Sequence, residues 1–120
     1  MVNKQSFLNA VYQDIEMVRG DTLAFNFEID GLAENAPENI IFRCAETYAD
    51  EPLFTASFHD GVSKESYSSG KALYSVWIDP DKTINLELAS YYYDLALITG
   101  DDVITLMRGR LTLLYEVSRG

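Results

Sequence analysis

The feature that most constrains the fold is a strict alternation of residue types over residues 23–29. Apolar side chains occupy every second position, namely Leu23, Phe25, Phe27 and Ile29. Successive side chains of an extended chain point to opposite faces, so a period of two predicts a strand with one buried face. The Asp30-Gly31 pair that follows is a turn signal and ends the strand.

Six other segments have the length and composition of strands and are separated by turn residues: 13–18, 39–45, 53–58, 73–78, 91–97 and 103–117. In segment 73–78 either Trp77 or the set Tyr74, Val76 and Ile78 faces inward. We predict an all-β fold, an antiparallel two-sheet immunoglobulin-like sandwich of about seven or eight strands. Asp79-Pro80 predicts a short capped helical turn near 80–88. Residues 63–70, rich in serine, are expected to form an exposed loop.

The length of 120 residues fits a single domain. We assign residues 13–120 to the sandwich and residues 1–12, which are weakly patterned, to an N-terminal arm or an edge strand.

Several positions carry structural predictions. Gly20 and Asp21 form the turn after the first strand. Tyr91 is expected to return its hydroxyl to the backbone a few residues upstream, as in the tyrosine corner of sandwich domains, with Tyr93 on the same face and Tyr92 pointing outward. The apolar residues of segment 103–117 change parity around Gly109, which predicts a β-bulge at that glycine.

Charge and residue counts exclude several classes of function. Nine basic residues against nineteen acidic ones give a formal net charge of -10, which repels nucleic acid and anionic membrane surfaces. The single histidine, His59, lies at a turn, and the single cysteine, Cys44, lies in an apolar strand and is expected to be a buried, inert thiol. We therefore expect no enzyme activity, no metal site and no cofactor.

The chain also resembles a known family in the order of its motifs. The motifs are Ile15-Glu16-Met17-Val18-Arg19-Gly20-Asp21-Thr22 with Phe25-x-Phe27, Pro80-x-x-Thr83-x-x-Leu86, Tyr91-x-Tyr93-Asp94-Leu95, Thr105-Leu106-x-x-Gly109-x-Leu111 and Glu116-Val117. In this order they resemble small all-β tail and baseplate modules of phages and prophages of Gram-positive bacteria, such as the N-terminal domain of baseplate upper proteins. Ser90 departs from that pattern, which commonly has a turn glycine there.

The resemblance implies a virion structural protein, a tail or baseplate connector or adaptor that is assembled in the bacterial host cytoplasm. It implies docking to other tail or baseplate proteins and homo-oligomer formation, without catalysis. Candidate interaction residues are Val18, Ile41, Trp77 and Tyr92. The alternative is a carbohydrate- or peptide-binding sandwich, which needs exposed aromatic residues beside polar groups. The candidates are Trp77, Tyr48, Tyr67 and Tyr92.

Overall fold

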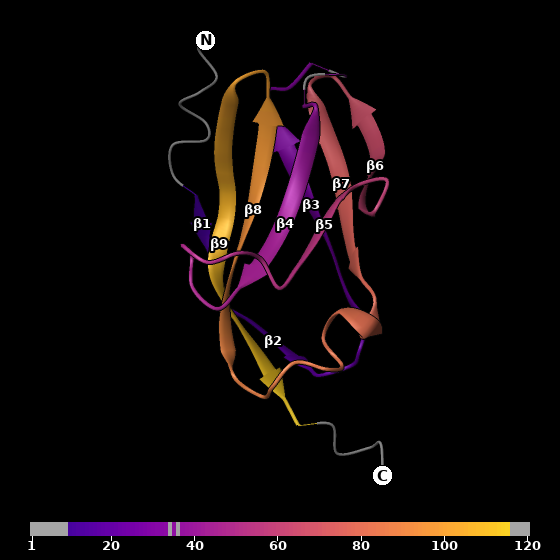
Figure 1. Cartoon of the computed structure of the whole chain (residues 1–120). Coiled ribbons are helices and arrows are strands. Elements are labelled where there is room, and N and C mark those ends of the chain that lie inside the picture. The colour runs from indigo at the N-terminus through magenta and orange to yellow at the C-terminus, as the bar shows by residue number, and fades with distance from the viewer. Residues whose placement is uncertain (1–9, 34, 36, 116–120) are drawn as a thin grey trace.

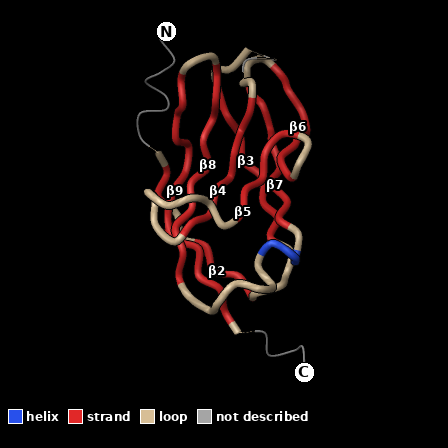
Figure 2. Tube along the Cα trace, in the orientation of Figure 1, coloured by secondary structure: helices blue, strands red, loops and turns tan. Residues whose placement is uncertain are grey.

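The computed structural model describes residues 10–33, 35 and 37–115. This part of the chain is nearly all β, and its helical content is one short 3-10 turn (Figures 1 and 2). The elements in chain order are β1 (Val11–Tyr12), β2 (Ile15–Val18), β3 (Leu23–Asp30), β4 (Asn39–Ala45), β5 (Phe54–Phe58), β6 (Gly61–Ser68), β7 (Lys71–Ile78), η2 (Pro80–Lys82), β8 (Ser90–Thr99) and β9 (Asp102–Leu114).

The strands form one continuous curled sheet in the order β1-β9-β8-β4-β5-β6-β7-β3, with β2 also paired to β9. The sheet is mixed, because β1 and β2 run parallel to β9 and β5 runs parallel to β6. The single continuous sheet and the mixed strand directions both differ from the predicted antiparallel two-sheet sandwich. The physical reason is β5, which pairs with β4 on one side and β6 on the other and so joins the two halves.

The core lies inside the curl and consists of the inward face of each strand. In β4, Ile40, Phe42 and Cys44 are fully buried, as the alternation predicts. In β7 the inward set is Tyr74, Val76 and Ile78, whereas Trp77 is 54% exposed. The Phe25 and Phe42 rings lie 6.1 Å apart and join the half containing β3 to the half containing β4.

The prediction of an exposed loop over residues 63–70 is wrong, because β6 pairs with β7 from Val62 to Ser68. Ser69 and Gly70 connect the two strands with φ angles of 52° and 82°. Two successive residues with positive φ make the turn that suits a two-residue hairpin. Backbone pairing does not require apolar side chains, so an exposed, serine-rich segment forms a strand here.

The predicted bulge in the last strand is present, but it lies at Leu106 and not at Gly109. Leu95 pairs with Met107 while Ala96 pairs with Thr105, which leaves Leu106 as the extra residue. Gly109 pairs regularly with Tyr93. A β-bulge therefore causes the parity change, as predicted, but the bulge lies three residues before Gly109.

The 3-10 turn η2 begins at Pro80, as predicted, but it ends at Lys82 and not near residue 88. Asp79 does not cap it through its side chain. Instead, Oδ1 of Asp79 accepts a 2.8 Å hydrogen bond from Nε1 of Trp77. The Asp79 carboxylate therefore accepts a hydrogen bond from the Trp77 indole, and not from the backbone N–H groups of η2 as predicted.

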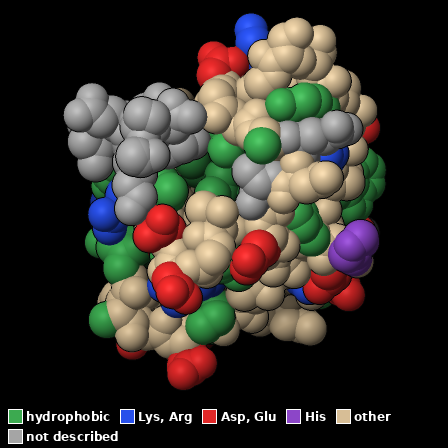
Figure 3. Space-filling view, turned by 90° about the horizontal axis from the view of Figure 1, so that it is seen from above, with side chains coloured by type: hydrophobic (Ala, Val, Ile, Leu, Met, Phe, Trp, Pro, Cys, Tyr) green, Lys and Arg blue, Asp and Glu red, His purple; other side chains and the backbone are tan. Residues whose placement is uncertain are grey.

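Of the predicted N-terminal arm over residues 1–12, residues 1–9 lie outside the described part of the chain, and Val11–Tyr12 form β1. Figure 3 shows acidic side chains scattered over the face seen from above. In the described ranges we find no group of three or more His, Cys, Asp and Glu side chains that could hold a metal ion. The described residues also include no helix with the length and apolar character needed to cross a membrane.

Candidate functional site

Tyr91 and Tyr93 both donate their hydroxyls to backbone carbonyls, Tyr91 to a residue nearby in the chain and Tyr93 to a distant segment. Tyr91 lies at the start of β8 and bonds the carbonyl of Glu87 at 2.8 Å, which is the geometry of a tyrosine corner. The Tyr93 hydroxyl bonds the carbonyl of Gln13, between β1 and β2. Burial, followed by the nearby carboxylate of Asp14, raises the pKa of Tyr93 to about 12, so its phenol remains a donor.

Gly109 is paired with Tyr93 in the sheet, and its Cα hydrogen side adjoins the backbone of Gln13. A Cβ atom placed on Gly109 would lie 2.2 Å from the Gln13 carbonyl oxygen. The chain is held at this short distance by hydrogen bonds on either side of Gly109, from Gln13 N to Arg108 O at 2.9 Å and from Arg110 N to Asp14 Oδ1 at 3.0 Å. Gly109 is thus required for a close approach of two backbone segments.

The turn at Gly20 and Asp21 is anchored to the segment around η2. Gly20 has a φ of 85°, and its N–H donates to Oγ1 of the buried Thr83 at 2.9 Å. Nη1 of Arg19 bonds the carbonyl of Leu86 at 3.0 Å. These contacts assign the turn a structural role.

The outer face of β4, β8 and β9 carries a group of cations and aromatic rings that we call the arginine–tyrosine face: Arg43, Tyr48, Tyr92, Arg108 and Arg110. The loop between β4 and β5, which crosses this face in Figure 1, contributes Tyr48. Its ring lies 4.7 Å from the Tyr92 ring, and Cζ of Arg108 lies 4.1 Å from its centroid. Cζ of Arg110 lies 5.5 Å from the Tyr92 centroid.

Hydrogen bonds fix these rings in one arrangement. The Tyr48 hydroxyl donates to the carbonyl of Gly109 at 3.1 Å, and Nη2 of Arg43 donates to the Tyr48 carbonyl at 3.1 Å. Nε of Arg43 also lies 3.9 Å from the Asp94 carboxylate. A hydrogen bond with Tyr48 raises the pKa of Arg108 above its ordinary value. The face is therefore ordered and cationic, although the chain as a whole is acidic.

The structure brings only part of the predicted interaction set to this face. Tyr92 belongs to it, and Ile41 lies on the same side of β4, half-buried in an interior strand rather than at a sheet edge. Val18, in β2, and Trp77, in β7, lie on other strands. Sequence reasoning named Tyr48 only as an exposed aromatic residue of the ligand-binding alternative, and it missed Arg108 and Arg110. Arg108 and Arg110 are two positions apart in a predicted strand, so the sequence could have indicated that both side chains lie on the same face.

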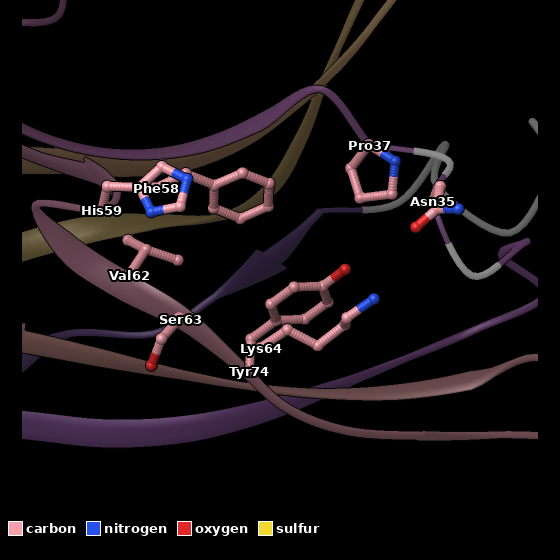
Figure 4. Close-up of a pocket in the computed structure, with 8 residues that line it drawn as sticks. All are labelled: Asn35, Pro37, Phe58, His59, Val62, Ser63, Lys64 and Tyr74. Atoms are coloured by element: carbon pink, nitrogen blue, oxygen red, sulfur yellow. The ribbon is translucent and has the colours of Figure 1, made fainter.

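A second feature is a pocket of about 420 Å³ beside β5, β6 and β7, drawn in Figure 4. The Phe58 and Tyr74 rings, stacked with centroids 6.1 Å apart, form its apolar wall, with Pro37 opposite. His59 and Ser63 line it, but the Ser63 hydroxyl bonds Glu65 at 2.9 Å. Among the described lining residues no nucleophile is paired with a base.

Cys44 is fully buried in β4, and burial raises its pKa to about 12. A neutral, inaccessible thiol is neither a nucleophile nor a metal ligand at neutral pH.

In comparisons with known proteins, no family model matches the chain, and no curated protein matches it either.

Proposed function

We propose that the chain is a structural docking module that binds another protein through the arginine–tyrosine face. The observation that carries this proposal is the ordered stack of Arg108, Tyr48 and Tyr92, with Arg110 beside it, on the outer face of the sheet. Tyrosine and arginine dominate the binding energy of protein interfaces, because they combine large contact area with directional donors.

The charge of the molecule favours a partner of defined chemistry. Guanidinium groups donate to carboxylates in a fixed planar geometry, so the face suits acidic or carbonyl-rich partner surfaces. The rest of this acidic chain repels such surfaces, since its formal net charge is -10. A local cationic face on an acidic molecule orients the encounter before contact is made.

The resemblance to phage tail and baseplate modules gives this docking role its setting. We infer a tail or baseplate connector or adaptor in the virion, assembled in the host cytoplasm, whose partners are other tail or baseplate proteins and further copies of itself. The immunoglobulin-like sandwich of such modules belongs to this proposal. The two halves of the curled sheet would correspond to its two layers, and the Tyr91 corner supports that correspondence.

The test is co-expression of the chain with each protein encoded by the neighbouring genes, followed by co-elution and measurement of Kd for any complex. Tyr92→Ala and Arg110→Gln should each weaken the complex about tenfold or more, because a residue at the centre of an interface contributes above about 1.4 kcal/mol.

Trp77→Ala is the matched control, since Trp77 is an exposed aromatic residue on β7, away from the face. Circular dichroism and urea unfolding establish that each variant is folded. The proposal is wrong if no neighbouring protein co-elutes, or if Trp77→Ala weakens the complex while Tyr92→Ala and Arg110→Gln do not.

The pocket beside β5 supports a second candidate function, binding of a carbohydrate or peptide. The half-buried Phe58 ring, stacked on the buried Tyr74 ring, provides the apolar surface on which a sugar or proline ring packs. A glycan array and titration with the monosaccharides it selects test this candidate. Binding that Phe58→Ala abolishes while Tyr92→Ala leaves it unchanged would establish it.

A further inference from the structure

The strand β3 ends the sheet and, within residues 10–33, 35 and 37–115, has one edge without a strand partner. Among the described residues it pairs with β7 alone, along its whole length from Leu23 to Asp30. An unpaired strand edge presents a row of backbone donors and acceptors that can pair with another chain. The eight-residue length of β3 makes this a long edge.

The inward side chains near this edge are incompletely covered. Leu23, Phe25 and Phe27 point toward the core but are only half-buried, whereas the inward residues of β4 and β8 are buried. A hollow of about 410 Å³ lies between β3 and residues 13–16, with Leu23 and Phe25 on one side and Ile15 and Met107 on the other. The curled sheet is therefore open beside β3.

We propose that β3 pairs through this edge with β3 of a second copy of the chain, antiparallel, with Asn26 on the two-fold axis. This inference rests on the proposed docking function, of which it names one partner. A two-fold contact brings the same surface of both copies together, so the strand must be complementary to itself.

The β3 sequence has this complementarity when Asn26 faces Asn26. Side chains that face each other across an antiparallel pair lie on the same side of the sheet. On the inner side, Phe25 of each copy then faces Phe27 of the other. On the outer side, Glu28 faces Ala24, so no two carboxylates are opposite. The facing pairs are therefore apolar with apolar, charged with neutral or, on the axis, amide with amide.

Charge distinguishes this register from the neighbouring one. With Phe27 on the axis instead, the two Glu28 carboxylates become diagonal neighbours, about 7–8 Å apart. With Asn26 on the axis they lie four positions apart, about 13 Å along the strands. That separation exceeds the screening length of about 8 Å at physiological salt. Repulsion between the two Glu28 carboxylates therefore favours the Asn26 register over the Phe27 register in this acidic chain.

Oxidative cross-linking of two single-cysteine variants tests both the edge and the register. Residues directly opposite each other have Cα atoms about 4.5–5.5 Å apart, within reach of a disulfide, so Asn26→Cys should give a covalent dimer. Glu28→Cys is the matched control, since its two copies would be about 13 Å apart and should stay unlinked. The native Cys44 is buried and does not interfere.

Sedimentation equilibrium of the full chain and of Asn26→Lys gives an independent measurement. The full chain should dimerise at high micromolar concentration and more strongly as NaCl is raised, because two copies with a net charge of -10 repel each other. Asn26→Lys places two ammonium groups opposite each other and should shift the chain to monomer. Circular dichroism and urea unfolding show whether this exposed substitution leaves the fold intact.

The inference is overturned if Asn26→Cys stays monomeric under oxidation, if Glu28→Cys cross-links equally, or if a folded Asn26→Lys dimerises like the full chain. The two proposals can fail separately. If Asn26→Lys still binds a tail protein, the docking function stands, and the cross-linking and sedimentation results alone decide whether β3 pairs with a second copy.

Discussion

Replacing Gly109 with alanine is the sharpest perturbation that the structure offers. The new Cβ would lie 2.2 Å from the Gln13 carbonyl oxygen and 2.8 Å from its carbonyl carbon. Both atoms belong to backbone, so one of the two segments must move. We expect this movement to cost about 1–3 kcal/mol as overpacking. Loss of the Tyr93 hydrogen bond to the Gln13 carbonyl adds about 1 kcal/mol.

One effect opposes this loss. Alanine restricts the unfolded chain and stabilises the fold by about 0.4–1 kcal/mol where the native backbone tolerates it. The net expectation is that Gly109→Ala lowers the free energy of unfolding by about 1–3.5 kcal/mol. Urea unfolding followed by far-ultraviolet circular dichroism measures this value. A loss below about 0.5 kcal/mol would refute the close-approach argument.

A double-mutant cycle separates the two contributions. Tyr93→Phe removes only the hydroxyl and should cost about 1 kcal/mol in the natural sequence. In the Gly109→Ala background the Gln13 carbonyl is already displaced, so Tyr93→Phe should cost much less. Equal costs in the two backgrounds would show that the alanine does not disturb the Gln13 carbonyl.

Two further predictions concern Tyr91 and Cys44. Tyr91→Phe should cost about 1 kcal/mol in urea unfolding, because the Glu87 carbonyl loses its donor, and unchanged stability would contradict the corner. Burial holds the pKa of Cys44 at about 12, so a thiol reagent at mildly alkaline pH should label the protein only after unfolding; rapid labelling of the folded protein would show that the thiol is accessible.

Local patterns were sufficient to predict most strands and the face that each one buries. The alternation in Leu23–Ile29 and in Tyr91–Leu97 matches the observed burial, because a period of two depends only on extended backbone and a single apolar side. Gly100, with a φ of 58°, lies in the turn between β8 and β9. A tight turn of this kind is predictable from the sequence, because it needs only local residues with suitable φ. Tyr91 also acts over a short range, four residues back along the chain.

Features that depend on pairing between distant segments were not predictable in this way. The bulge lies at Leu106 because the register between β8 and β9 shifts there. The alternation of side chains in β9 alone cannot locate this shift, because the register depends on both strands. Gly109 was assigned to that bulge, whereas its role comes from the backbone of Gln13, far away in sequence. Residues 63–68 have no apolar pattern, and their strand exists because β7 supplies its backbone partners.

The arginine–tyrosine face also depends on contacts between segments that are far apart in the sequence. Parity within β8 and β9 indicates that Tyr92 and Arg110 share the outward side, and this much is local. Tyr48 reaches the face from a loop, and its hydroxyl bonds a residue 61 positions later in the chain. Sequence by itself determined which side chains point outward; only the curled sheet decided which of them meet, because contact between distant residues is set by strand order and register.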